Sequence, residues 1–126
     1  MGCIRLLLTY RTHTKMRYPL TFYVDSLPPD VGGCANGPVI RILEKYKDDE
    51  GIYQHELVHV KQWFMTFGLH SLLYMWLDWY KLGSEIEAYR EQAKHYPDDR
   101  RKKFAGYIAK YYGLSVTAAQ VEQQLY

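Results

Sequence analysis

The pattern H-E-x-x-H at residues 55–59 constrains the fold of this chain more than any other feature. It lies in a run, residues 51–63, whose composition is that of a single helix. Residues four apart lie on the same helix face, one turn apart, so the imidazoles of His55 and His59 can reach one zinc ion. Glu56 projects toward the same cleft and is the candidate catalytic residue, acting as general base on water.

Bulk properties exclude several classes of protein. The 126 residues predict a single domain over 1–126, and an apolar content of 48% argues against disorder. A net charge of +2, with scattered Lys and Arg, does not suggest a nucleic-acid partner. Cys3 and Cys34 lie far apart in the sequence and are predicted to be reduced thiols of a cytoplasmic protein rather than a disulfide.

No targeting or membrane-spanning segment is expected. Residues 4–8 are interrupted by Arg5 and are too short for the apolar part of a secretory signal, which favours a cytoplasmic location. The longest uncharged run, residues 62–77, falls short of the roughly 20 apolar residues of a membrane span. We expect a buried helical arm there. The alternative is an interfacial membrane contact through an apolar face of Phe64, Phe67, Leu72, Met75, Trp76 and Trp79.

The patterning predicts an α+β fold, with strands before the H-E-x-x-H helix and helices after it. Branched and aromatic residues predict strands at 4–10, 20–24 and 39–43, and the Gly- and Pro-rich stretch 28–38 predicts a loop. Asp48, Asp49 and Glu50 suit the N-terminus of the helix that follows.

After Gly68, which should interrupt the helical run, further helices are predicted at 71–80, 85–95 and 97–112. Ser84 and Glu87 read as a capping box that starts the second of these helices. Gly113 should end the third, and Thr117 with Gln120 predicts a capping box for a short C-terminal helix.

A catalytic zinc site needs a third protein ligand. The metzincin continuation fails, because Gln62 and Met65 stand where that pattern has glycine and histidine. A glutamate from a later helix is the other common solution, and Glu85 and Glu87 are the candidates. Glu85 is preferred, because the small Ala88 would let the two site helices pack closely and because Glu87 has the capping role.

The strings GIYQHELVHVKQW and EIEAYR resemble small H-E-x-x-H…E-x-x-A proteins of bacteria and tailed phages, which are minimal gluzincin-like metallopeptidases. The resemblance covers about residues 39–92. It implies a minimal zincin-like fold with a small N-terminal twisted sheet, an active-site helix and C-terminal helices. It also implies one Zn²⁺ ion held by His55, His59 and Glu85, with Glu56 as the base. The chain departs from the thermolysin-type pattern at Ser84, where Asn is usual, and at Tyr89, where an Asp would orient His55.

Two functions are therefore expected. The first is a zinc metallopeptidase acting on a polypeptide substrate, bound along the exposed edge of strand 39–43. Tyr89, Arg90 and Tyr53 are its candidate oxyanion donors. The alternative is a catalytically silent zinc-binding structural or assembly protein with a protein partner, such as a phage virion or tail component. The third histidine of this region, His70, is expected to be a partly buried polar residue and not a ligand.

Overall fold

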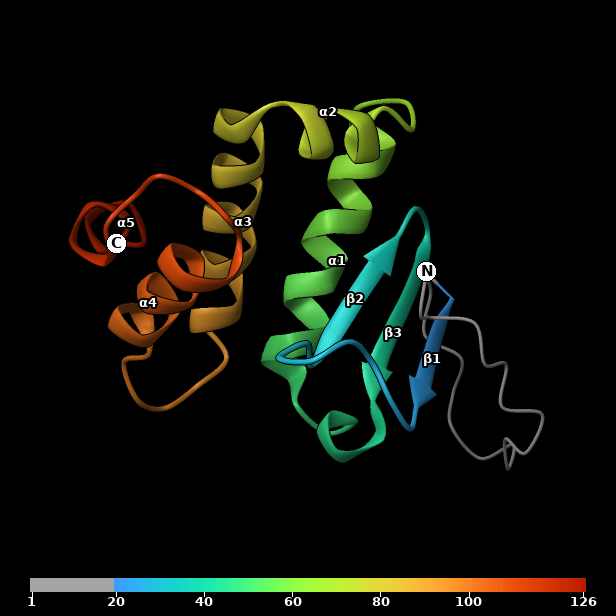
Figure 1. Cartoon of the computed structure of the whole chain (residues 1–126). Helices are drawn as coiled ribbons and strands as arrows, with labels where there is room; N and C mark the ends of the chain where they lie inside the picture. The colour runs from blue at the N-terminus through green and yellow to red at the C-terminus, as the bar shows by residue number, and fades with distance from the viewer. Residues whose placement is uncertain (1–19) are drawn as a thin grey trace.

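The computed structural model describes residues 20–126, which form the predicted α+β arrangement of a small sheet and several helices (Figure 1). The predicted strand at 4–10, with Cys3, lies outside the described residues, so that strand and the state of the cysteines stay predictions. The elements in chain order are β1 (Thr21–Val24), β2 (Gly33–Asn36), β3 (Val39–Leu43), a 3-10 turn (Glu44–Tyr46), α1 (Glu50–Met65), α2 (His70–Trp76), α3 (Asp78–Ala93), α4 (Arg101–Tyr111) and α5 (Ala118–Gln124).

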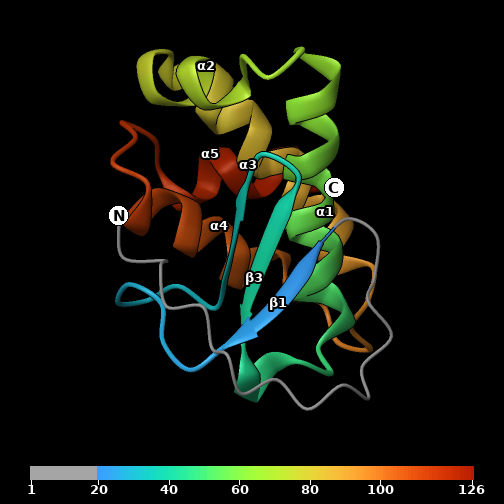
Figure 2. The same cartoon turned by 90° about the vertical axis from the view of Figure 1, so that its right-hand side faces the viewer.

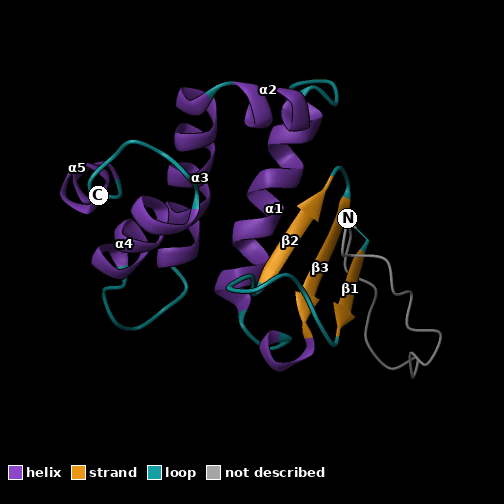
Figure 3. Ribbon diagram, viewed as in Figure 1, coloured by secondary structure: helices purple, strands orange, loops and turns teal. Residues whose placement is uncertain are grey.

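The sheet has the order β1-β3-β2, with β3 parallel to β1 and antiparallel to β2 (Figure 3). The loop predicted over 28–38 is thus wrong in part, since β2 forms there and turns into β3 at Gly37, whose φ is +60°. A strand edge of β3 is not exposed either, because both of its edges are paired. The edge strand next to α1 is β2, which corrects the expected position of a bound peptide (Figure 1).

Two apolar cores hold the fold together. Alternate residues of β3 are buried, and Ile40 and Ile42 pack with Tyr53 and Val60 of α1 under the sheet. A second core joins α3, α4 and α5. Figure 2 shows the sheet lying over α1, with α4 and α5 behind. Helix α1 therefore packs against the sheet on one side and against α3 on another.

Helix α1 begins as predicted, because the Asp49 carboxylate caps it by accepting a hydrogen bond from the Ile52 amide at 3.1 Å. The helical run is interrupted at Phe67 and Gly68, whose φ values of 52° and 84° are left-handed. The predicted helix 71–80 is divided at Leu77, whose backbone is extended, into the end of α2 and the start of α3.

The capping role predicted for Ser84 and Glu87 is wrong. Ser84 lies inside α3, which begins at Asp78, so its side chain is not needed to satisfy the end of a helix. Further on, α4 is followed by Gly113 with φ of +66°, and Thr117 forms the predicted capping box with Gln120. No helix among residues 20–126 is both long and apolar enough to cross a membrane.

The buried arm predicted over 62–77 is also wrong. Most of its large apolar side chains are exposed, including Phe67 at 96% and Trp76 at 75%. Figure 1 shows α2 lying at one end of the molecule, across the neighbouring ends of α1 and α3. These side chains have no apolar neighbours on their outer side within the described chain.

Candidate metal centre

Three side chains from two helices converge in the interior. His55 and His59 project from α1, and Glu85 projects from α3, with exposed fractions of only 6%, 9% and 2%. The two Nε2 atoms lie 3.2 Å apart. The Glu85 carboxylate completes the group, with Oε1 3.1 Å from Nε2 of His59 and Oε2 3.4 Å from Nε2 of His55. These three residues could hold a metal ion.

The spacing of these atoms fits a tetrahedral ion. Ligand atoms at about 2.0–2.1 Å from a tetrahedral zinc lie about 3.3–3.4 Å from one another. The nitrogen–nitrogen separation of 3.2 Å is close to this edge length, and so is the distance from each nitrogen to the carboxylate oxygen that faces it, 3.1 Å for Oε1 and 3.4 Å for Oε2. Oε2 of Glu85 is moreover buried and accepts no hydrogen bond. A buried carboxylate oxygen without a donor is costly unless a cation is present, so the residues fit a bound metal.

Charge coupling within the group is strong. Burial alone would raise the pKa of Glu85, but attraction to the imidazoles of His59 and His55 outweighs burial and holds this pKa below its usual value. Burial likewise opposes protonation of His59, but the Glu85 carboxylate outweighs it and raises the pKa of His59 to about 9. This coupling favours the protonated form of His59 when no metal is bound.

A polar pair behind His59 fixes its orientation. Nδ1 of His59 lies 2.9 Å from Oε1 of Gln62, one turn further along α1. The Ser84 hydroxyl donates to the same oxygen at 2.6 Å. Since Gln62 Oε1 can only accept, Nδ1 of His59 carries the hydrogen, and the lone pair of Nε2 faces His55 and Glu85. This is the arrangement that a metal ligand requires.

His55 has no such partner. Its Nδ1 is buried and makes no hydrogen bond, and the Tyr89 ring packs edge-on against the imidazole at 4.4 Å between centroids. The sequence suggested this, since Tyr89 stands where an orienting Asp was expected. Packing, not a hydrogen bond, holds the ring of His55.

Helix α2 contributes to the site from the side. The Tyr74 hydroxyl donates to Oε1 of Glu85 at 2.7 Å. His70 lies nearby, with its ring 5.8 Å from that of His59, and its Nδ1 is 2.7 Å from the Tyr80 hydroxyl. As predicted, His70 is partly buried. The contact of Tyr74 with the proposed ligand was not anticipated from the sequence.

Glu87, the alternative third ligand, lies elsewhere. Its side chain is exposed, and its nearest polar contact is a long one of 3.4 Å from Nε2 of Gln62. In a helix, residues two apart point in different directions, so Glu85 and Glu87 cannot both point at the histidines, and Glu87 lies instead beside Gln62. The structure brings Glu85 to the histidines.

Glu56 is buried beside the site under β2, with an exposed fraction of 6%. A Cβ atom added at Gly33 would lie 3.3 Å from Oε1 of Glu56, so the missing side chain of this glycine leaves room for the carboxylate. Burial raises the pKa of Glu56, with the two histidines acting in the opposite direction.

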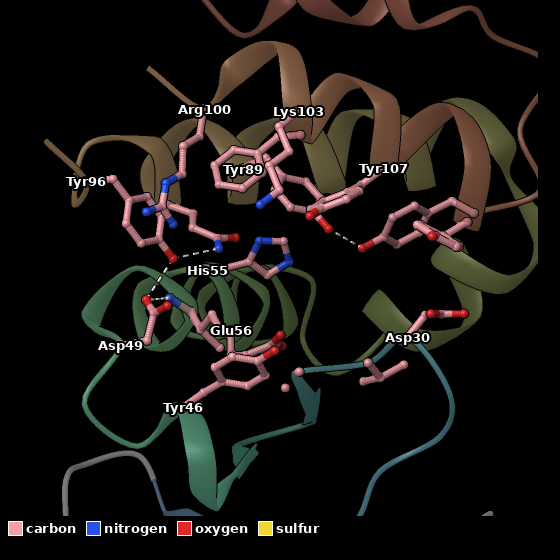
Figure 4. Close-up of a pocket in the computed structure, with 18 residues that line it drawn as sticks. Asp30, Tyr46, Asp49, His55, Glu56, Tyr89, Tyr96, Arg100, Lys103 and Tyr107 are labelled. Carbon is pink, nitrogen blue, oxygen red and sulfur yellow. Dashed lines mark hydrogen bonds between the residues drawn. The ribbon is translucent and has the colours of Figure 1, made fainter. Parts of the chain in front are cut away.

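His55 and Glu56 line a cleft of about 360 Å³ between α1 and β2 on one side and α4 on the other (Figure 4). Tyrosine and phenylalanine make up seven of its 18 lining residues, and both cationic and acidic side chains also line it. The aromatic members of the lining are Tyr46, Tyr89, Tyr96, Phe104, Tyr107, Tyr111 and Tyr112, and its charged members besides Glu56 are Asp30, Asp49, Arg100 and Lys103.

Of the three predicted oxyanion donors, one lines this cleft. Tyr89 lies there and its hydroxyl is 2.9 Å from that of Tyr112. Arg90 is exposed and Tyr53 is buried in the core under the sheet, so neither borders the cleft. Tyr112 was missed because it follows α4, far from the motif in the sequence, and only the packing of α4 against α3 brings it close.

Comparison with known proteins gives no family assignment. No protein-family model matches the chain, and no curated protein or solved structure matches it. The geometry of the site is therefore the basis for the function of this protein.

Proposed function

We propose that this protein is a zinc-dependent metallopeptidase of the gluzincin type, with a minimal zincin-like fold. The observation that carries the proposal is the buried convergence of His55, His59 and Glu85 next to a carboxylate, Glu56, that borders an open cleft. A purely structural zinc site is usually closed by four protein ligands. Three ligands with a cleft beside them support a catalytic site.

When bound, zinc supplies Lewis acidity and lowers the pKa of water in its open position toward about 7. His55, His59 and Glu85 hold the ion. In the proposed reaction Glu56 accepts the proton of the attacking water and delivers it to the leaving amine nitrogen of the scissile bond. Glu56 is largely buried under β2 but lines the cleft, so substrate and the attacking water would meet its carboxylate there.

The cleft residues supply substrate binding and charge stabilisation in this proposal. A polypeptide in extended conformation would pair with β2, the edge strand whose residue Gly33 borders the cleft. The hydroxyl of Tyr89 or Tyr112 would donate to the developing oxyanion. Their mutual hydrogen bond at 2.9 Å leaves one of the two hydroxyl hydrogens for a ligand.

The test combines metal content with proteolysis. Untagged protein should contain one zinc per chain by elemental mass spectrometry and should cleave fluorescein-labelled casein or members of a mixed peptide library. Glu56→Gln should retain zinc and lose activity by about a hundredfold or more. Glu44→Gln, at an exposed carboxylate, is the matched control and should change neither.

Each part of this test can fail separately. If the wild-type protein binds zinc but cleaves no substrate, the peptidase function is overturned. The alternative, a catalytically silent zinc-binding structural or assembly protein, is then favoured. Absence of zinc, after zinc has been offered and the excess removed, would overturn both functions.

A further inference from the structure

The largest unexplained feature of the molecule is an apolar tip at the end formed by α2 and the adjoining ends of α1 and α3. Its members share high exposure, between 50% and 96%. They are Phe64, Met65, Phe67, Leu69, Leu72, Met75, Trp76 and Trp79. Soluble proteins rarely expose so many large apolar side chains together, and such patches mark interaction surfaces.

Helix α2 has the reverse of the usual amphipathic pattern. The side that faces the protein carries His70 and Tyr74, whose polar atoms bond to Tyr80 and Glu85. Its outer side carries Leu72, Met75 and Trp76, at 55%, 71% and 75% exposure. A surface helix in water normally presents the opposite arrangement. The outer side of α2 is therefore suited to an apolar surrounding.

The charges around the apolar tip favour a lipid surface as that surrounding. The sequence has no charged residue between Lys61 and Asp78. Lys61, which is exposed, lies one turn below the end of α1, and Lys81 lies one turn into α3. Along the helix axes Lys61 thus stands about 6 Å behind Met65, and Lys81 stands about 3 Å behind Trp79, at the depth of lipid headgroups. Asp78 is the opposing charge, so the local excess is positive.

The exposed side chains of the apolar tip also favour a lipid surface. Met65, Phe67 and Trp79 have exposures of 72–96%, so most of each side chain is open to contact from outside the molecule. The two exposed tryptophans of the apolar tip, Trp76 and Trp79, suit the membrane–water interface, where an aromatic ring lies between acyl chains and headgroups.

We infer that the apolar tip is a peripheral membrane-binding surface that inserts into the interfacial region of bilayers containing anionic lipid. Leu72, Met75, Trp76 and Trp79 enter the boundary of the acyl chains, and Lys61 and Lys81 contact anionic headgroups. This inference is independent of catalysis, because none of these residues lies in the proposed metal site.

The experiment is co-sedimentation of the zinc-loaded protein with large vesicles of phosphatidylcholine, with and without one-third phosphatidylglycerol. Wild-type protein should bind the mixed vesicles, and its tryptophan emission should shift to the blue, since Trp76 and Trp79 are two of its three tryptophans. Leu72→Asp/Met75→Asp should reduce the bound fraction by about tenfold or more. Lys61→Gln/Lys81→Gln should weaken binding to the vesicles that contain phosphatidylglycerol and should not change binding to phosphatidylcholine vesicles.

The matched control is Leu20→Asp/Phe22→Asp, which alters apolar residues exposed at 45% and 43% on the sheet, and it should bind as wild type does. Circular dichroism and zinc content show whether each variant is folded. Absence of wild-type binding to both kinds of vesicle would overturn the inference without any variant. So would a dimer, seen by sedimentation velocity, that Leu72→Asp/Met75→Asp dissociates while vesicles bind nothing, because a second copy would then cover the apolar tip.

Discussion

The side-chain oxygen of Gln62 lies 2.9 Å from Nδ1 of His59 and fixes which nitrogen of this imidazole faces the metal centre. Gln62→Leu keeps a residue of similar volume but removes the acceptor, so His59 can adopt the wrong tautomer. We expect the zinc affinity to fall by about 10–100-fold, measured by competition with a chromophoric chelator. Gln54→Leu, on another side of the same helix, should leave the affinity unchanged, and an equal loss in both variants would contradict the orienting role.

The two glutamates of α3 should behave differently. Glu85→Gln removes a charged ligand atom from the buried group and should abolish stoichiometric zinc binding at micromolar protein. Glu87→Gln changes an exposed side chain and should retain one zinc per chain. Elemental analysis after gel filtration measures both. Retention of zinc in Glu85→Gln, with loss in Glu87→Gln, would reverse the assignment.

Zinc binding should release a proton from His59. In the metal-free protein its pKa is raised to about 9, so the imidazole is protonated at pH 7.5 and a metal must displace that proton. The affinity for zinc should therefore rise as the pH increases from 7 toward 9. At lower pH the proton on His59 competes with the metal more strongly. Calorimetric titration in buffers of different ionisation enthalpy measures the number of protons released.

The variant Glu85→Gln serves as the control for this proton. Without the carboxylate, the attraction that raises the pKa of His59 is lost, and burial then favours the neutral ring. An NMR titration of the metal-free variant should show His59 titrating well below its wild-type range. An unchanged titration would show that Glu85 does not face His59 in solution.

Two glycines in helices should respond oppositely to alanine. A Cβ atom at Gly51 would lie 2.6 Å from the Tyr96 ring, whose hydroxyl donates to Asp49 at 2.7 Å. Overpacking costs about 1–3 kcal/mol, which exceeds a helix-propensity gain of about 1 kcal/mol or less near a helix start. Gly51→Ala should therefore lower the free energy of unfolding by about 1–2 kcal/mol.

Gly83 is the matched position, because nothing lies within 4 Å of a Cβ atom there. Gly83→Ala, inside α3, should raise the free energy of unfolding by up to about 1 kcal/mol. Urea denaturation monitored by circular dichroism measures both variants. Stabilisation of both would mean that Tyr96 moves aside without cost.

The local parts of the site were predictable from the sequence and the tertiary parts were not. The i, i+4 spacing of His55 and His59 fixes their common face within one helix, whatever surrounds it. The same reasoning could have found Gln62, three residues after His59, but it was considered only as a departure from another motif. Tyr74 and Tyr112 reach the site through helix packing, which no local pattern records.

The wrong predictions about the fold also arise from tertiary contacts that no local pattern records. Ser84 has the composition of a helix cap, yet α3 already begins at Asp78, and the serine serves the site through Gln62. The residues of β2 have low strand propensity, and pairing with β3 overrides it. The arm over 62–77 was expected to be buried on apolar content alone, whereas burial depends on what else the chain can place against it.

Tyr74 joins the apolar tip to the metal centre, because it extends from α2 and donates to Glu85. Along α1, Met65 lies six residues beyond His59, which is about 9 Å of helix. If the apolar tip rests on a bilayer, the zinc site is held at a fixed height above the lipid surface. Only bonds a short distance from the lipid surface would come within reach, such as those in the stalk of a membrane-anchored protein. Position along a tethered chain, more than the residues beside the bond, would then decide where it is cut.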